Sequence, residues 1–280
     1  MLIYASDLDQ TLIYSERSRG MDVDDRIMIP AEQVDGRIIS HISIRALEQL
    51  KQIAESIPFV PVTTRVLDLY HRIHIFREQI VPKYAITSNG AHILIDGQVN
   101  REWHEQVMQD VRDQAAPPSE AIAAFHRVSD PSWIIRESYW EDTFFSVLVD
   151  RDRMPDEQVM AIQPELEQLG WGLSIQGRKV YLVPFPVSKN RAIEHVKLLA
   201  GADQVIASGD SLLDRGLLDQ ADYAIAPAHG ELYRGFRSGE LQCNYGFTAQ
   251  SGIQAAENIL QFVMDIMNRE GIMHYERTES

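Results

Sequence analysis

The 280-residue sequence has little cysteine and little positive charge. Its single cysteine, Cys243, cannot form an intramolecular disulfide, so we expect a fold without disulfides in a reducing compartment. Lysine and arginine total 26 against 41 aspartate and glutamate residues, and the formal net charge of −15 argues against binding to a nucleic-acid backbone or an anionic membrane. An anionic ligand must therefore find positive charge that is concentrated locally.

Long hydrophobic runs and low-complexity segments are missing as well. No apolar run approaches membrane-spanning length, and the first residues lack the pattern of a secretory signal, so we expect a cytoplasmic protein. Hydrophobic residues make up 45% of the chain and charged residues 24%, as in ordinary folded proteins. A chain of this length can bury a large core, and we expect two domains.

Short apolar segments alternate with helical patterns at both ends of the chain. The first segment, Leu2 to Ser6, stops at Asp7, as expected of a buried parallel strand that delivers a polar group at its carboxyl end. The alternation predicts an α/β fold with a Rossmann-like parallel sheet, covered on both faces, whose ligands bind beyond the carboxyl ends of the strands. The other predicted strands are Pro58 to Val62, Tyr84 to Thr87, Gln204 to Ser208 and Asp222 to Ala226.

The middle of the chain contains a unit of one helical stretch and two strands, which occurs twice. Such a repeat predicts an antiparallel sheet with helices on one face, inserted in the core as a separate α+β cap domain. We place the cap at residues 92–183 and the core at residues 1–91 and 184–280. The predicted cap helices cover about 102–125 and 155–169, and the predicted strands cover 133–138, 143–150, 172–176 and 178–183.

A long excursion from Ile13 to Ile42 separates the first predicted strand from the first predicted helix. It contains Asp35 and Gly36 between apolar flanks, which is a strong hairpin signal. We therefore expect a β-hairpin flap at about residues 25–42, beside the end of the first strand.

Polar residues suited to phosphate chemistry stand where predicted strands end or a predicted helix begins. A carboxylate such as Asp7 can attack phosphorus, and a second one, Asp9, can protonate the leaving oxygen and later activate water. Neighbouring carboxylates need a counterion, for which Mg²⁺ is suited, while Lys189 and the Thr63 hydroxyl would stabilise the transferring phosphoryl group. The segments are Asp7-Leu8-Asp9-Gln10-Thr11, Thr63-Thr64-Arg65, Lys189 and Gly209-Asp210-Ser211-Leu212-Leu213-Asp214.

Together these segments resemble the motifs of the haloacid dehalogenase superfamily of phosphohydrolases. Members with a large α/β cap, such as sugar-phosphate, sucrose-phosphate and mannosyl-3-phosphoglycerate phosphatases, carry it where this chain has its insertion. The resemblance implies a Mg²⁺-dependent phosphatase that acts on a small phosphorylated metabolite through an aspartyl-phosphate at Asp7. It also implies that Asp7, Asp210 and the backbone carbonyl of Asp9 are the metal ligands.

Further residues have supporting roles in this hypothesis, and two depart from the family pattern. Thr11 would organise the first loop, and Asp214 would hold the lysine ammonium. Asn89 either matches the capped relatives or belongs to a plain turn. Leu213 stands where relatives often have asparagine and Thr64 where they have glycine, but neither change removes a carboxylate, a metal ligand or the lysine.

Residues that contact the substrate's leaving group are expected mainly on the cap, because the phosphate-binding groups cannot distinguish one ester from another. Arg136 and Lys179 on predicted cap strands and Arg65 on the core are the candidates. Within its strand, we expect the row of Ile134, Arg136 and Ser138 to face the cleft. The alternative for each cap residue is an ordinary exposed position.

Two other functions remain open. A phosphotransferase or phosphomutase would use the same intermediate but pass the phosphoryl group to a second hydroxyl. A non-catalytic regulatory protein that binds phosphorylated metabolites would keep the fold, although it would be expected to lack Asp7, Asp9 or Lys189, and all three are present. The sequence does not distinguish hydrolysis from transfer.

Overall fold

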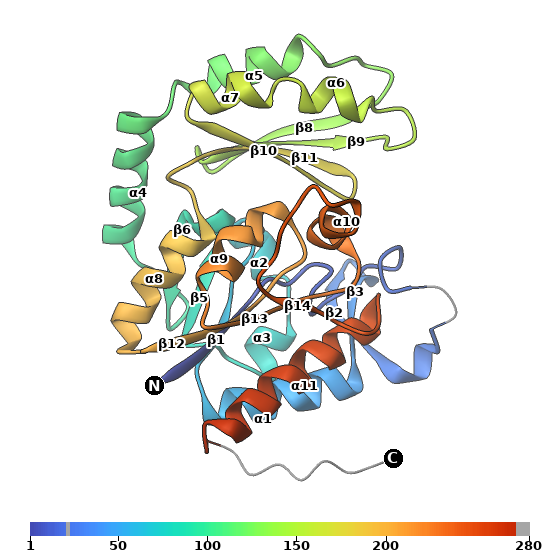
Figure 1. The fold of residues 1–280 in the computed structure, drawn as a ribbon, viewed down its shortest axis with the longest axis vertical. Coiled ribbons are helices and arrows are strands. Elements are labelled where there is room, and N and C mark those ends of the chain that lie inside the picture. The colour runs from blue at the N-terminus through green and yellow to red at the C-terminus, as the bar shows by residue number, and fades with distance from the viewer. Residues whose placement is uncertain (21–22, 273–280) are drawn as a thin grey trace.

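The computed structural model describes residues 1–20 and 23–272 and has a parallel sheet at its centre, with a smaller lobe above it (Figure 1). Neighbouring strands of the central sheet are all parallel. This confirms the predicted α/β core. The strand order is β14 (Gly246–Phe247), β13 (Tyr223–Ala226), β12 (Gln204–Ser208), β1 (Leu2–Ser6) and β4 (Phe59–Pro61).

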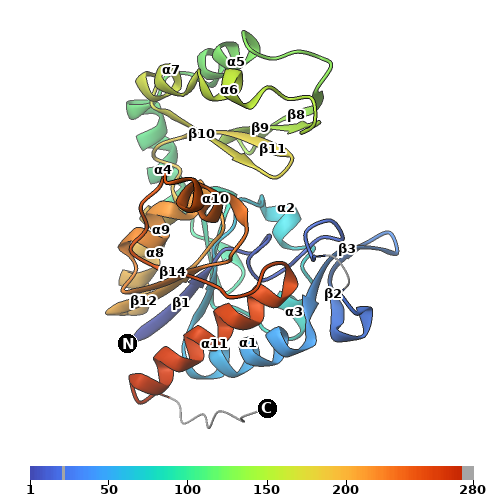
Figure 2. The ribbon, with the colours of Figure 1, turned by 45° about the vertical axis from the view of Figure 1, so that its right-hand side comes forward.

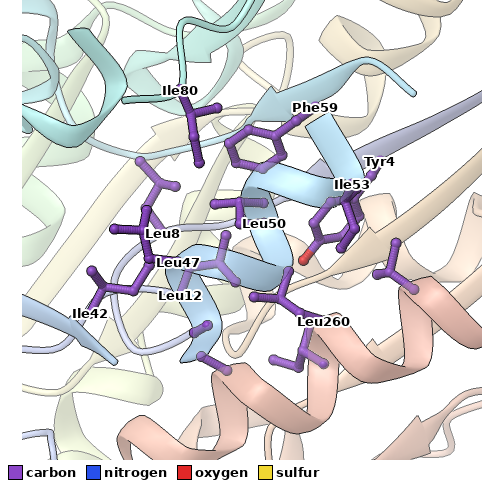
Figure 3. Close-up of a cluster of buried hydrophobic side chains, with 14 of the residues drawn as sticks. Tyr4, Leu8, Leu12, Ile42, Leu47, Leu50, Ile53, Phe59, Ile80 and Leu260 are labelled. Atoms are coloured by element: carbon purple, nitrogen blue, oxygen red, sulfur yellow. The ribbon is translucent and has the colours of Figure 1, made fainter. Parts of the chain in front are cut away.

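Helices cover both faces of this sheet. On one face α1 (Ile44–Ser56) and α11 (Ile253–Arg269) lie side by side (Figures 1 and 2), and on the other lie α8 (Lys189–Ala200) and α9 (Arg215–Gln220). Strand β1 is buried on both sides because its side chains alternate between two hydrophobic clusters. Tyr4 belongs to the first, where it meets side chains of α1 and α11 (Figure 3).

The cap is a four-stranded antiparallel sheet with short helices on the face that points away from the core (Figure 2). Both predicted helical stretches are interrupted: α4 (Arg101–Gln114) ends before Pro117, and a break at residues 161–162 divides the second stretch. The strand order is β10 (Trp171–Gln176), β11 (Lys179–Pro184), β9 (Phe144–Val149) and β8 (Ile134–Trp140), and the helices are α5 (Pro118–His126), α6 (Asp156–Met160) and α7 (Gln163–Gln168).

The predicted flap is present as a two-stranded antiparallel hairpin at the side of the core (Figure 2). Its strands are β2 (Met28–Val34) and β3 (Arg37–Ser43). Asp35 and Gly36 connect them with positive φ angles of 48° and 76°, the left-handed conformation that an Asp-Gly hairpin turn requires.

A second small sheet adjoins the core, and it bears on the predicted domain boundary at residue 92. Strand β5 (Tyr84–Thr87) pairs with β6 (His92–Ile95), and β6 pairs with β7 (Gln98–Val99). Residues 92–99 therefore pair with a core strand rather than with the cap sheet, while the division into domains stays a prediction. Other short elements are η1 (Asp25–Ile27), α2 (Leu67–Tyr70), α3 (Ile75–Glu78), η2 (Ser88–Gly90), η3 (Leu212–Asp214) and α10 (Gly230–Ser238).

Within residues 1–20 and 23–272, no helix is both long enough and apolar enough to cross a bilayer.

Candidate active site

Three neighbouring strands of the central sheet end at the same edge, beneath the cap. Asp7 follows β1, Asp210 lies two residues beyond β12, and Thr63 lies two residues beyond β4. The Asp7 backbone N–H donates to the Ser208 carbonyl at 2.9 Å, so the sheet pairing continues as far as the first carboxylate. The parallel topology thus brings together three of the predicted site residues.

Lys189, the first residue of α8, lies between two carboxylates. Its Nζ donates to Asp7 Oδ1 at 2.6 Å and to Asp214 Oδ1 at 2.5 Å, and all three side chains are buried. Asp7 Oδ2 in turn accepts a hydrogen bond from Thr11 Oγ1 at 3.2 Å. Lys189 and Thr11 therefore fix the orientation of the Asp7 carboxylate from both sides.

The Asp214 carboxylate is itself held firmly. Its Oδ2 accepts hydrogen bonds from the Ser211 hydroxyl at 2.6 Å, from the Ser211 N–H at 3.0 Å and from the Asp210 N–H at 3.2 Å. Gly209 makes this packing possible, because a Cβ at that position would lie 2.5 Å from the Asp214 Cβ. Asp214, predicted to hold the lysine ammonium, does contact Lys189, and Ser211 is an additional partner of Asp214 that the sequence analysis missed.

The loop before α8 is positioned by the predicted supporting residue Asn89. Its Nδ2 donates to the Val187 carbonyl at 3.0 Å. Gly90, with φ of 104°, lies so close to the chain that a Cβ would be 2.3 Å from the Ser188 carbonyl oxygen. The Asn-Gly pair thus places the residues that precede Lys189, which a plain solvent-exposed turn would not do.

The site carries more buried negative charge than positive charge. Burial is the main cause that raises the pKa of Asp7 to about 7; Lys189 opposes this shift, and the nearby Asp214 and Asp9 add to it. Burial also raises the pKa of Asp210 well above its usual range, with further contributions from Asp7 and Asp214. Three carboxylates and one ammonium group leave a formal charge of −2, so the site has a physical need for a cation.

Asp7, Asp210 and Asp214 could hold that cation. One carboxylate oxygen from each lies within 4.8 Å of the others. Oxygen ligands of this kind suit a hard divalent metal ion. Asp214 accepts one hydrogen bond at Oδ1 and three at Oδ2, whereas Asp7 accepts one at each oxygen, so Asp214 has less capacity left for a metal ion than Asp7.

Asp9 lies outside this cluster because its side chain binds Arg65. Arg65 Nε donates to Asp9 Oδ2 at 2.7 Å and Nη2 donates to Oδ1 at 2.8 Å, while Nη1 donates to Glu32 Oε2 at 2.7 Å. Burial acts to raise the pKa of Asp9, but the Arg65 guanidinium outweighs it and the pKa is lowered. Arg65, predicted as a substrate contact, thus also joins Asp9 to Glu32 of the flap, a buried partner that the sequence analysis missed.

A cavity of about 530 Å³ opens beside Asp9. It lies between the core, the flap and the β10–β11 end of the cap. Two of the three predicted substrate contacts, Arg65 and Lys179, line it. The lining residues are Asp9, Gln10, Ser15, Arg17, Ser18, Glu32, Ile39, Arg65, Leu69, Leu148, Gln176, Gly177, Arg178 and Lys179.

Arg136 lies on the predicted face of the cap sheet but is not among the residues described as lining this cavity. It pairs with Leu148, which does line the cavity, and directly paired residues point to the same face.

The prediction that Ile134 faces the cleft is wrong. An irregularity in register between Ile134 and Arg136 turns Ile134 toward the hydrophobic cluster under the cap helices.

Two glutamates that were not predicted form hydrogen bonds between the core and the cap. Glu231, in the first turn of α10, accepts hydrogen bonds from the Ser174 hydroxyl of the cap at 3.2 Å and from the Leu212 N–H of the core at 2.9 Å. Glu141, in the β8–β9 turn of the cap, accepts hydrogen bonds from the Ser88 hydroxyl and the Leu67 N–H. Long-range acidic contacts of this kind have no local sequence signal.

Comparison with known proteins agrees with the fold and with the motifs. The family model described as "Sucrose-6F-phosphate phosphohydrolase" matches residues 1–232, while no curated protein matches significantly in sequence. The chain is therefore a phosphoric monoester hydrolase of the haloacid dehalogenase superfamily. Within that class, it belongs to the sucrose-6F-phosphate phosphohydrolase family.

Solved structures with low sequence identity share the whole fold. A sucrose-phosphatase from Synechocystis sp. PCC6803 has a TM-score of 0.65 at 14% identity over 95% of this chain and 97% of that one. A sugar phosphatase of subclass IIB gives 0.58 at 13% identity, with 98% and 100% coverage. A Thermoplasma acidophilum protein gives 0.58 at 14% identity, with 98% and 99% coverage. These likenesses extend through both the core and the cap.

Proposed function

We propose that this protein hydrolyses a small phosphorylated sugar or a related phosphate monoester in the cytoplasm, with Mg²⁺ and through an aspartyl-phosphate at Asp7. The observation that carries the proposal is the buried Asp7 carboxylate, oriented by Lys189 and Thr11 at the carboxyl end of β1. Support for a sugar comes from the family match and from the Synechocystis structure, which was solved "in complex with sucrose and phosphate".

In the first step an oxygen of Asp7 attacks phosphorus, and the bond between phosphorus and the ester oxygen breaks. Asp9 gives its proton to that ester oxygen, so the leaving group departs as an alcohol. In the second step Asp9 takes a proton from water, the water oxygen attacks phosphorus, and the bond to Asp7 breaks. Inorganic phosphate is released and both carboxyl groups return to their starting states.

Positive charge and hydrogen-bond donors must already be present where negative charge develops on the phosphoryl oxygens. Lys189 lies beside the attacking carboxylate and supplies a fixed charge. Thr63 supplies a hydroxyl group, whose oxygen accepts the Arg65 N–H at 3.1 Å and is thereby oriented.

The carboxylates present fit a divalent cation, because burial raises the pKa values of Asp7 and Asp210 in its absence. Asp7, Asp210 and the backbone carbonyl of Asp9 would hold Mg²⁺. When bound, it would neutralise the carboxylates and draw charge from a phosphoryl oxygen.

Asp9 must leave Arg65 before it can act as an acid, since both of its oxygens accept hydrogen bonds from the guanidinium. Glu32 makes this release less costly, because Arg65 keeps one carboxylate partner when Asp9 turns to the leaving group. Glu32 is thus a positioning residue for the acid.

A panel of phosphate esters tests the function. With Mg²⁺ and no acceptor alcohol, we expect release of inorganic phosphate from at least one sugar phosphate, loss of activity on chelation and recovery on adding Mg²⁺. Phosphate release that needs an acceptor would favour a phosphotransferase. No turnover of any ester would contradict the proposal.

Metal binding should stabilise the fold more at pH 8 than at pH 5.5. Without metal, the raised pKa of Asp7 in the folded state makes its ionisation costly, so this residue's contribution to stability falls as pH rises from about 4 through 7. Mg²⁺ removes that cost, whereas at pH 5.5 a proton already does so. Thermal unfolding with and without Mg²⁺ measures the difference.

The matched control for this measurement is Asp210→Asn, which should lose most of the rise in Tm that Mg²⁺ gives at pH 8. An equal rise at both pH values would show that the buried carboxylates are not the metal site.

Replacing Glu32 with glutamine should slow the hydrolysis of esters with poor leaving groups more than that of esters with good leaving groups. Arg65 would then bind Asp9 alone, which lowers the pKa of the acid further and resists its release. We expect kcat for a sugar phosphate to fall about tenfold, a fraction of the usual contribution of a general acid. The kcat for para-nitrophenyl phosphate, whose leaving group needs no proton, should fall much less.

Gln33→Ala, an exposed neighbour on the same strand, is the control and should change neither rate. Equal losses on both substrates in Glu32→Gln would assign Glu32 to folding or to binding of the phosphate instead.

A further inference from the structure

The cavity beside Asp9 is richer in positive charge than the rest of this acidic chain. Of its six lining residues with charged side chains, four are cationic and two are anionic. In the whole chain the balance is the opposite, 26 basic against 41 acidic residues. The cationic residues are Arg17, Arg65, Arg178 and Lys179, and the anionic ones are Asp9 and Glu32.

Three of these cations form no salt bridge among the residues that the structure describes. Arg65 is bound by both Asp9 and Glu32, so the two anions of the cavity are already paired. Within residues 1–20 and 23–272, Arg17, Arg178 and Lys179 form no salt bridge; Arg178 Nε makes one long hydrogen bond of 3.4 Å, to the Val149 carbonyl. The cavity therefore keeps three cations that form no salt bridge, although Lys179 is attracted through space by the Asp9 carboxylate.

These cations lie on the leaving-group side of the site. Asp9, which would protonate the leaving oxygen, lines the cavity, whereas Asp7, Lys189 and Asp210 do not. The phosphoryl group would already have Lys189 and a metal ion, so it does not require three further cations. The cavity is thus the place where the rest of the substrate would lie.

The cap hairpin that carries Arg178 and Lys179 is tied to the core at one point. Gln176, next to the β10–β11 turn, donates a hydrogen bond through Nε2 to the Ser211 hydroxyl of the core at 2.9 Å. The Lys179 ammonium lies 6.0 Å from the centre of the buried Tyr181 ring, which attracts it on the cavity side of the turn. The exposed side chains of Arg178 and Lys179 therefore line the cavity from a hairpin that is tied to the core.

From this charge distribution we propose that the leaving group of the natural substrate carries a second anionic group, a carboxylate or a second phosphate. This deepens the proposed phosphatase function and rests on it. Arg178 and Lys179 of the cap and Arg17 of the core bind that group, while Lys189 and the metal ion bind the phosphate that is transferred. A neutral sugar leaving group would leave these three cations unpaired in the complex.

The test uses pairs of esters that differ in one group. Sorbitol 6-phosphate has a CH₂OH group where 6-phosphogluconate has a carboxylate. Glycerol 1-phosphate and 3-phosphoglycerate differ in the same way. Fructose 6-phosphate and fructose 1,6-bisphosphate test a second phosphate. We expect kcat/KM to favour the anionic member of at least one pair at least tenfold, and the pair concerned identifies the group. A ratio near one or below one in every pair would overturn the proposal.

Substitutions then locate the effect. In Lys179→Gln and in Arg178→Gln, the preference for the anionic member should fall about tenfold, the loss expected when one charged partner is removed. Lys197→Gln, on α8 away from the cavity, is the control and should keep the preference. Equal losses for both members of a pair would mean that the cations act on the transferred phosphate, which would also overturn the proposal.

Binding to an inactive variant separates this inference from the proposed function. In Asp7→Asn, titration calorimetry should show tighter binding of the anionic member of the favoured pair. If the natural protein hydrolyses no ester but this preference remains, the catalytic proposal fails and the second anion site stands. If hydrolysis occurs with no preference in rate or binding, the second anion site fails and the catalytic proposal stands.

Discussion

Asp7→Asn should be a folded protein with no measurable turnover. We expect kcat for the best substrate to fall by at least about four orders of magnitude, as when a nucleophile is removed from other covalent mechanisms. An amide has the same shape as the carboxylate and can still accept a hydrogen bond from Lys189, but its oxygen is too weak a nucleophile to attack phosphorus.

The same substitution should make the metal-free protein more stable at pH 8. Asp7 pays an ionisation cost in its buried position, and Asp214 and Asp9 add repulsion. Asparagine removes one of three buried negative charges near Lys189 and leaves the contact between Lys189 and Asp214 in place. Tm in chelator should therefore equal or exceed that of the natural protein, while the rise in Tm on adding Mg²⁺ becomes smaller.

Activity and stability together make this test decisive. Phosphate release by a freshly purified Asp7→Asn sample at more than about 1% of the natural rate would remove Asp7 as the nucleophile. Loss of activity together with a large drop in Tm would instead assign Asp7 a structural role.

Much of the core and its site was predictable because the signals are local. A buried strand is a short apolar run, and β1 ends at Ser6, directly before the polar Asp7. In a parallel sheet the carboxyl ends of neighbouring strands meet at one edge, so Asp7, Thr63 and Asp210 come together once the strands are assigned. The Asp35-Gly36 turn also predicted its hairpin from two residues alone.

The interactions that the sequence analysis missed depend on tertiary contacts. Glu32 lies 33 positions from Arg65, and nothing near Glu32 in the sequence distinguishes it from an exposed strand residue. The inward turn of Ile134 depends on an irregularity of strand pairing that residue alternation does not reveal. The role of Arg178 likewise appears only when the cap hairpin lies over Asp9.

Replacing Lys189 with methionine should reduce both activity and stability strongly. The loss of stability should depend on pH. Methionine keeps most of the length of the side chain but lacks the ammonium that binds Asp7 and Asp214. Activity should fall by about two to three orders of magnitude, the cost of removing a donor that stabilises the transition state.

The free energy of unfolding of this variant should also fall, because Lys189 neutralises buried carboxylates. Breaking a buried ion pair from one side costs about 3 to 5 kcal/mol, because the remaining charge has no partner. Without Lys189 the pKa of Asp7 should rise above its value of about 7, so Asp7 binds a proton at pH 5.5 but is largely ionised, without its cationic partner, at higher pH. The loss in free energy of unfolding should therefore be large at pH 8 and much smaller at pH 5.5.

Denaturant unfolding in chelator at the two pH values measures this loss, with Lys197→Met on the same helix as the control. Equal destabilisation at both pH values would indicate that Lys189 acts through packing rather than charge. The double variant Asp7→Asn with Lys189→Met completes the argument. If repulsion among buried carboxylates is the cause, removing Asp7 should restore part of the stability lost at pH 8, although no activity returns.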